Sequence, residues 1–250
     1  MRNGLKLSYM VVVALMGAFP AFSATPHKAH VVVLGAARKV PYSKAGDPAG
    51  AAPGESELKV RALLVDGAVK EWTTGDAHDV TDRSFVVRRV IKLNDALPRD
   101  KSGSSEKTSA KPTPAASNWV WQRGPWLLVD RRTGRVVVLK LPHYDPGASQ
   151  VVWFRDYGAY CGVTASGKSL YAMVAQVAAR KPLLARKMSV YDSENHPEPA
   201  CAPAEWQREP LRVTFHPAGR EPVSFDIVPG SAVLVEDAND EAETPAAAPK

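Results

Sequence analysis

Hydrophobic residues along this chain occur in many short runs, and most of these runs alternate with polar residues. Alternation with a period of two and a β-branched composition are typical of β-strands. In the run from Arg83 to Leu93, for example, this spacing places Phe85, Val87 and Ile91 on one face. The pattern predicts strands at His30–Leu34, Leu58–Val65, Ala68–Thr74, Arg83–Leu93, Trp126–Asp130, Arg135–Leu141, Gln150–Phe154, Leu211–Phe215, Val223–Val228 and Ser231–Val235.

Turn signals separate these runs at short intervals. Asp66-Gly67 is a hairpin turn dipeptide, and Arg131–Gly134 is a four-residue loop that ends in glycine. Closely spaced strands joined by such turns favour an antiparallel sheet over a fold with crossover helices. The sequence therefore predicts an all-β, antiparallel fold, either a β-sandwich or a small β-propeller-like arrangement, with at most one short helix.

One apolar segment, Leu170–Ala179, fits two kinds of element. Its apolar residues fit helical spacing, but they also alternate as in a strand, so periodicity leaves both open. The turn Thr164–Lys168 and the apolar residues after it are similar to the blade hairpins of bacterial β-propellers. That resemblance implies a strand at this position.

Three stretches contain few of the apolar residues that offset the entropy of ordering a chain. Ser43–Glu57 and Pro98–Ser117 are rich in Gly, Pro, Ala and Ser, and residues 236–250 form an acidic tail. We expect flexible loops near 43–57 and 98–117, a disordered tail, and a single β-rich domain over residues 25–235.

The first 24 residues have the features of a secretory signal peptide. Arg2 and Lys6 precede a short apolar run, and Ala21-Phe22-Ser23 provides the small residues that flank a signal-peptidase cut. The sequence thus predicts a bacterial protein that is periplasmic or secreted. It contains no second apolar stretch, so no transmembrane segment is expected after signal removal.

The formal net charge of +6 is unevenly distributed. Setting aside the signal region and the acidic tail leaves 29 basic and 21 acidic residues. A basic exported core suits solubility, and it also suits anionic envelope polymers or lipid headgroups. Nucleic acid is not an expected partner outside the cytoplasm.

The two cysteines, Cys161 and Cys201, are expected to form a disulfide, because an even number in an exported chain favours pairing. The alternative is a nucleophilic Cys161 thiol, with His196 or His216 as its base, in a hydrolase of the cell envelope.

Gly162–Ser169 matches the phosphate-binding pattern G-x-x-x-x-G-K-[ST]. In a P-loop this segment follows a buried strand and opens a helix. Here the preceding residues, Trp153–Gly158, are partly polar, so a hairpin turn is the favoured interpretation. A nucleotide site that uses Lys168 and Ser169 remains the alternative.

Aromatic and arginine residues gather between residues 119 and 155. Most aromatic rings of a β protein belong to its core. Any exposed remainder would form a binding surface for a glycan or a protein partner. The candidate ligand-binding residues are Trp119, Trp121, Trp126, Arg131 and Arg155.

No motif fixes a reaction, a cofactor or a metal site, and no catalytic residue is assigned. The sequence favours a non-enzymatic binding or envelope-assembly module over an enzyme. The alternatives are the cysteine-dependent envelope hydrolase and, after it, the P-loop protein.

Overall fold

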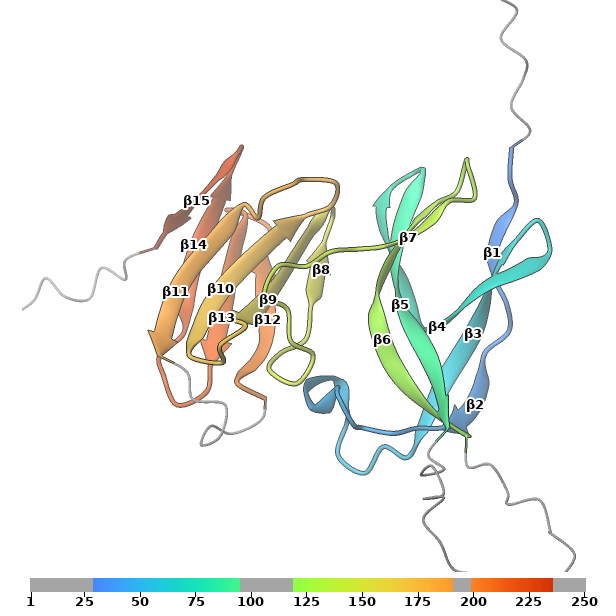
Figure 1. Ribbon diagram of the computed structural model, residues 1–250. Coiled ribbons are helices and arrows are strands. Elements are labelled where there is room, and N and C mark those ends of the chain that lie inside the picture. Colours follow the sequence, from blue (N-terminus) through green and yellow to red (C-terminus); the bar gives the residue numbers. More distant parts are fainter. Residues whose placement is uncertain (1–28, 95–118, 191–198, 236–250) are drawn as a thin grey trace, which may run out of the picture.

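Three antiparallel sheets make up the protein in a computed structural model that describes residues 29–94, 119–190 and 199–235 (Figure 1). Within these residues the helical content is limited to one short 3-10 turn, η1 (Pro48–Gly50). The predicted all-β, antiparallel fold is therefore confirmed. The predicted signal peptide, the loop near 98–117 and the acidic tail lie outside the described residues.

The N-terminal sheet has seven strands in the order β1-β3-β4-β5-β6-β7, and β2 also pairs with β3. It curls so that the chain after β2 reaches β6, where the Ser43 N–H donates to the Trp121 carbonyl at 2.8 Å. The strands are β1 (Val32–Leu34), β2 (Arg38–Pro41), β3 (Glu57–Val65), β4 (Ala68–Thr81), β5 (Ser84–Asn94), β6 (Trp119–Asp130) and β7 (Val136–Val138).

The two faces of β5 pack into different core clusters. Phe85 and Val87 are buried in one cluster, and Val90, on the opposite face, is buried in another. The register between β5 and β6 shifts between Arg88 and Val90, which pair with Trp126 and Arg123, so the extra residue of this β-bulge lies in β6, at Gly124-Pro125. Alternation along β5 is therefore kept, but Ile91, on the face of Phe85 and Val87 near the end of the strand, is 38% exposed.

The C-terminal strands form two four-stranded sheets, ordered β11-β10-β9-β8 and β12-β13-β14-β15. Their facing side chains share one core cluster, which includes Val174 from the first sheet and Phe215 and Phe225 from the second. This packing is a β-sandwich. The strands are β8 (Val152–Phe154), β9 (Tyr157–Val163), β10 (Ser169–Gln176), β11 (Leu184–Val190), β12 (Cys201–Gln207), β13 (Arg212–Pro217), β14 (Val223–Val228) and β15 (Ser231–Leu234).

The predicted disulfide is present between Cys161 in β9 and Cys201 in β12, with their Cα atoms 6.2 Å apart. Both residues are 1% exposed within the sandwich core. The bond links the two sheets covalently.

The segment Leu170–Ala179 begins as strand β10, which pairs with β9 and β11. Its residues are buried on both faces: Ala172 and Val174 face the sandwich core, while Met173 and Ala175 belong to a separate cluster with Tyr160. A strand covered on both sides needs no polar face. The sequence of this strand is therefore apolar throughout and does not show a clear period.

Residues 139–151 connect β7 to β8 and are called the linker below (Figure 1). They pack on the outer face of β9 and β10, where Tyr160 donates to the Pro142 carbonyl at 2.7 Å. Trp126 of the N-terminal sheet joins the same apolar cluster. The linker thus fastens the N-terminal sheet to the sandwich.

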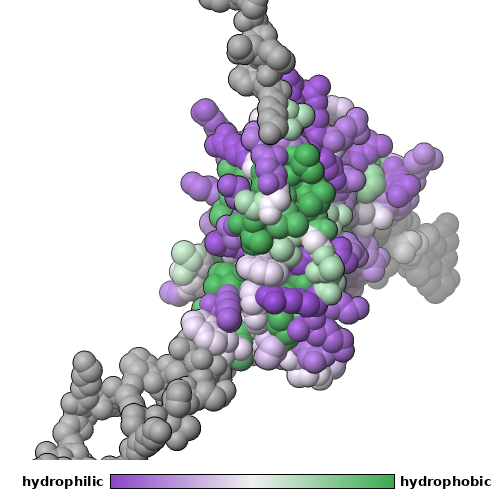
Figure 2. Space-filling view, turned by 90° about the vertical axis from the view of Figure 1, so that its right-hand side faces the viewer, coloured by the Kyte–Doolittle hydropathy of each residue, from purple (hydrophilic) through white to green (hydrophobic). Residues whose placement is uncertain are grey.

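The face of the N-terminal sheet that is turned away from the sandwich carries an apolar area (Figure 2). Val33 in β1 and Val69 in β4 are each about half exposed, and both belong to this sheet. Within the described part of the chain, no helix is long and apolar enough to cross a membrane.

Removing the disulfide should lower the stability of the sandwich markedly. The bond closes a loop of 40 positions, for which chain entropy predicts a stabilisation of about 4 kcal/mol. Reduction, or the double change Cys161→Ala and Cys201→Ala, should lower the midpoint of thermal unfolding by about 8–16 °C. Circular dichroism with and without reductant measures this shift. An unchanged midpoint would contradict a structural role.

Candidate functional site

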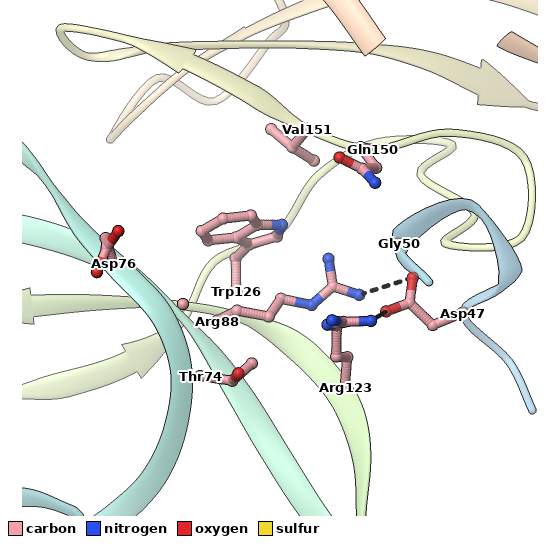
Figure 3. Close-up of a pocket in the computed structure, with 10 residues that line it drawn as sticks. Asp47, Gly50, Thr74, Asp76, Arg88, Arg123, Trp126, Gln150 and Val151 are labelled. Carbon is pink, nitrogen blue, oxygen red and sulfur yellow. Dashed lines mark ion pairs between the residues drawn. The ribbon is translucent and has the colours of Figure 1, made fainter. Parts of the chain in front are cut away.

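A pocket of about 230 Å³ lies where the N-terminal sheet meets the end of the linker (Figure 3). Strands β4, β5 and β6, the η1 turn and the linker all contribute to its wall. Its lining residues are Asp47, Gly50, Thr74, Gly75, Asp76, Arg88, Arg123, Trp126, Gln150 and Val151.

Asp47 is held at this pocket by the loop that was expected to be flexible. Pro48 begins η1, and the Gln150 side chain donates to the Ala49 carbonyl at 2.6 Å. A Cβ atom at Gly50 would lie 2.6 Å from the Asp47 carboxylate, so the close approach requires glycine. The Asp47 side chain is only 2% exposed.

Two arginines converge on this carboxylate from neighbouring strands (Figure 3). Arg88 Nη2 lies 3.8 Å from Asp47 Oδ1, and Arg123 Nη1 lies 3.8 Å from Asp47 Oδ2. At that separation the groups attract each other without forming a direct hydrogen bond. Both arginine side chains are largely buried, at 10% and 17% exposure.

Each guanidinium also donates to a tyrosine. Arg88 Nη1 donates to the Tyr144 hydroxyl and Arg123 Nη1 to the Tyr42 hydroxyl, both at 2.7 Å. Arg123 Nη2 donates further to the Glu55 carboxylate at 2.9 Å. The cluster therefore joins the 43–57 loop, β5, β6 and the linker through charge-assisted hydrogen bonds.

Burial governs the ionisation of the cluster. Desolvation raises the pKa of Asp47, and the nearby Arg88 and Arg123 guanidinium groups offset only part of this rise. Burial likewise raises the pKa of Tyr144 and of Tyr42, which keeps both phenols protonated. Two buried atoms, Asp47 Oδ2 and Arg88 Nε, form no hydrogen bond with any described residue. One is an acceptor and the other a donor.

Trp126 supplies the aromatic wall of the pocket. Its ring packs edge-on against Trp153, with centroids 5.3 Å apart, and the Arg88 guanidinium lies 5.5 Å from its centroid. Trp126 is the only one of the five candidate binding residues that lines this pocket.

The other four candidates lie elsewhere and do not form one surface. Trp121 is 6% exposed and packs in the core of the N-terminal sheet. Trp119 is exposed beside Lys92, and Arg131 pairs with Asp79 at 2.6 Å. Arg155 lies in the β8–β9 turn, where its carbonyl accepts a hydrogen bond from His78.

The sequence did not identify several of the pocket residues as members of a binding site. Asp47 lies in a Gly- and Pro-rich stretch that resembles a solvated loop. Arg88 is a charged residue within a strand, yet it is only 8% exposed because the N-terminal sheet packs against the linker on that side. The Asp-Pro pair at 47–48, typical of turn initiation, was the available hint.

The structure shows the surroundings of the two features that suggested an enzyme, the P-loop pattern Gly162–Ser169 and the Cys161 thiol. Gly162–Ser169 connects β9 to β10 as a hairpin turn, closed by Thr164 N–H to Ser169 carbonyl at 3.1 Å. A P-loop requires a helix after the motif, but strand β10 follows it here.

The Cys161 sulfur is bonded to Cys201, which leaves no thiol nucleophile there. Among the described residues, no three His, Cys, Asp or Glu side chains are grouped to hold a metal ion.

Comparison with known proteins adds no further assignment. No protein-family model, curated protein or solved structure matches the chain.

The raised pKa of Asp47 predicts a pH-dependent difference between the wild-type protein and Asp47→Asn. A carboxyl whose folded pKa is raised contributes stability below its unfolded pKa, and this contribution is lost as pH rises through the folded value. The unfolding free energy of the wild type minus that of Asp47→Asn should therefore fall as pH rises from about 3 to about 7. Urea unfolding at a series of pH values measures it, and a rising difference would contradict the assignment.

Lys168→Ala should leave the protein almost unchanged. The side chain is exposed in a hairpin turn, so its loss should alter the free energy of unfolding by less than about 0.5 kcal/mol. ATP should not raise the thermal midpoint of either form. Stabilisation by ATP that Lys168→Ala abolishes would contradict the hairpin interpretation.

Proposed function

We propose that this protein is an exported, non-enzymatic binding module of the bacterial envelope, and that its ligand is a neutral sugar unit of an envelope glycan bound in the Asp47–Arg88–Arg123 pocket. Export is supported by the signal-like first 24 residues and agrees with the disulfide, since such bonds persist in oxidising compartments.

The charge of the pocket favours a neutral ligand. Its four ionisable lining residues are two acids, Asp47 and Asp76, and two arginines, Arg88 and Arg123. Their formal charges cancel. An anion would meet two carboxylates and a cation would meet two guanidinium groups, so neither gains a net attraction.

The hydrogen-bonding groups favour hydroxyls. A sugar hydroxyl both donates and accepts, which matches a site that presents carboxylates as acceptors and guanidinium groups as donors. Asp47 Oδ2 and Arg88 Nε, one acceptor and one donor that form no hydrogen bond with the described residues, are the observation that carries the proposal. Because both atoms are buried, we expect the ligand to displace the pocket wall slightly when it binds.

Shape and apolar surface agree with a single ring. The cavity of about 230 Å³ is smaller than the roughly 300–1,000 Å³ of pockets that hold drug-sized ligands. Trp126 and Val151 supply apolar wall beside the polar groups. Ligand sites commonly combine such apolar surface with a few placed polar groups.

Neutral hexoses and N-acetylhexosamines should perturb the indole N–H resonance of Trp126 in a nitrogen-15 tryptophan spectrum. Trp126→Phe should weaken binding about tenfold, which corresponds to about 1.4 kcal/mol. Trp119→Phe is the matched control, because Trp119 is 43% exposed and lies outside the pocket; it should bind as the wild type does. If no neutral sugar shifts Trp126, or if Trp119→Phe has the same effect, the proposal fails.

Removing the exposed acid Asp76 from the pocket should change the preference between charged and neutral sugars. The Asp76 side chain is 96% exposed, so Asp76→Asn should preserve the fold while giving the pocket a net positive charge. Binding of a hexuronate should then rise relative to the matching neutral hexose, as measured by titration calorimetry at low salt. Wild-type protein that already prefers the hexuronate would contradict the charge-balance argument.

A further inference from the structure

A second depression, distinct from the pocket, lies between the linker and the β10–β11 connection. It has a volume of about 680 Å³, within the range of pockets that hold small molecules. A smaller cavity of about 220 Å³ shares Leu139, Leu141 and Ala175 with it. The two form one continuous groove, called the linker groove below.

The charged residues that line the linker groove all have the same sign. They are Lys140 from the linker and Arg180 and Lys181 from the β10–β11 connection. All three are exposed, and none pairs with a carboxylate of the described residues. Of the residues that the structure describes, no Asp or Glu lines either cavity. The nearby Asp156 carboxylate accepts the Gln176 amide at 2.7 Å.

The rest of the groove is mainly apolar. Leu139, Leu141 and Pro142 line it from the linker, and Ala175 and Pro182 face them from β10 and the connection that follows. Val138, at the start of the groove, is 51% exposed. An apolar surface edged by cations that have no carboxylate partner among the described residues matches a molecule with an apolar body and an anionic head.

The backbone of the groove argues against an extended peptide as the occupant. The Leu139 N–H already donates to the Trp126 carbonyl at 2.8 Å, and the Ala179 N–H donates to the Gln176 carbonyl at 3.1 Å. Ala175 and Gln176 are paired with β9, and Pro142 and Pro182 have no N–H. A bound strand would find few main-chain partners, and burying its unpaired amides is costly. An acyl chain has no such requirement.

From these observations we infer that the linker groove binds an anionic membrane lipid, with the acyl chain along Leu139, Leu141 and Pro142 and the headgroup phosphate at Lys140, Arg180 and Lys181. This site is independent of the sugar pocket and would hold the module at a membrane surface. The attraction is electrostatic in part, so it should weaken as salt is added.

Vesicle flotation with the full exported chain tests the inference. The protein should float with phosphatidylcholine vesicles that contain phosphatidylglycerol and should remain unbound with phosphatidylcholine alone. Each of Lys140→Gln, Arg180→Gln and Lys181→Gln should weaken binding about fivefold, as about 1 kcal/mol per cation near an anionic surface implies, and the triple variant about a hundredfold.

A matched triple variant controls for loss of overall charge. Arg186→Gln, Lys187→Gln and Arg220→Gln remove the same number of exposed cations outside the groove and should change binding less than about twofold, because charges beyond a Debye length are screened. Equal losses in the two triple variants would overturn the site and leave only general charge attraction.

The apolar part of the site has its own test. Val138→Ser should weaken vesicle binding several-fold, whereas Val33→Ser, a similarly exposed valine on the far face, should not. Soluble glycerophosphoglycerol should compete poorly, because it has no acyl chain. The assignment to a lipid would be overturned if glycerophosphoglycerol competed as strongly as the lipid does. It would also be overturned if polyglutamate competed equally well.

Discussion

The buried carboxylate of Asp47 is the constraint on which the junction between the N-terminal sheet and the linker depends. A charge that is 2% exposed is costly unless opposite charges and hydrogen bonds surround it. Arg88 and Arg123 supply the opposite charge, and Tyr144 and Tyr42 hold the two guanidinium groups in place. The same contacts fix the 43–57 loop against β6 and bring Tyr144 of the linker to β5. Loss of one partner would leave a buried charge uncompensated.

The middle sheet of the three has a comparable structural role. Strands β9 and β10 are covered on one face by the second sheet of the sandwich and on the other by the linker and Trp126. The glycines of β9 permit this close approach, because a Cβ at Gly158 would lie 2.7 Å from the Trp153 ring and one at Gly162 would lie 2.8 Å from Met173. The two ends of the linker then border two different cavities: Gln150 and Val151 line the Asp47–Arg88–Arg123 pocket, and Leu139–Pro142 line the linker groove.

The sequence predicts the fold class because alternation and turn dipeptides depend on local physics. The Asp66-Gly67 hairpin and the strands from β13 to β15 lie close to their predicted positions. Strand β9 escapes prediction because its Gly and Ala residues have low strand propensity and are selected by packing from both sides. The bulge opposite Arg88 also escapes, because its extra residue lies in β6 at Gly124-Pro125, before the predicted strand Trp126–Asp130.

The candidate site is less predictable than the fold because its parts are distant in sequence. The Asp47–Arg123 pair joins residues 76 positions apart, and burial, which gives the pair its chemistry, appears only after the sheet curls. Trp126 was identified from its aromatic neighbourhood, while Trp121 in the same neighbourhood is a core residue. Composition draws attention to the aromatic and arginine residues of this region but does not show which of them face a cavity.

The central claim is that the Asp47–Arg88–Arg123 pocket holds a unit of an envelope glycan. Hydrogen exchange of the full chain, followed by mass spectrometry with and without purified neutral envelope polysaccharide, tests it most directly. The account predicts slower exchange in peptides that cover residues 43–57, 74–76 and 147–151, with no change in β11. Unchanged exchange in all three segments, or protection confined to other parts of the chain, would contradict it.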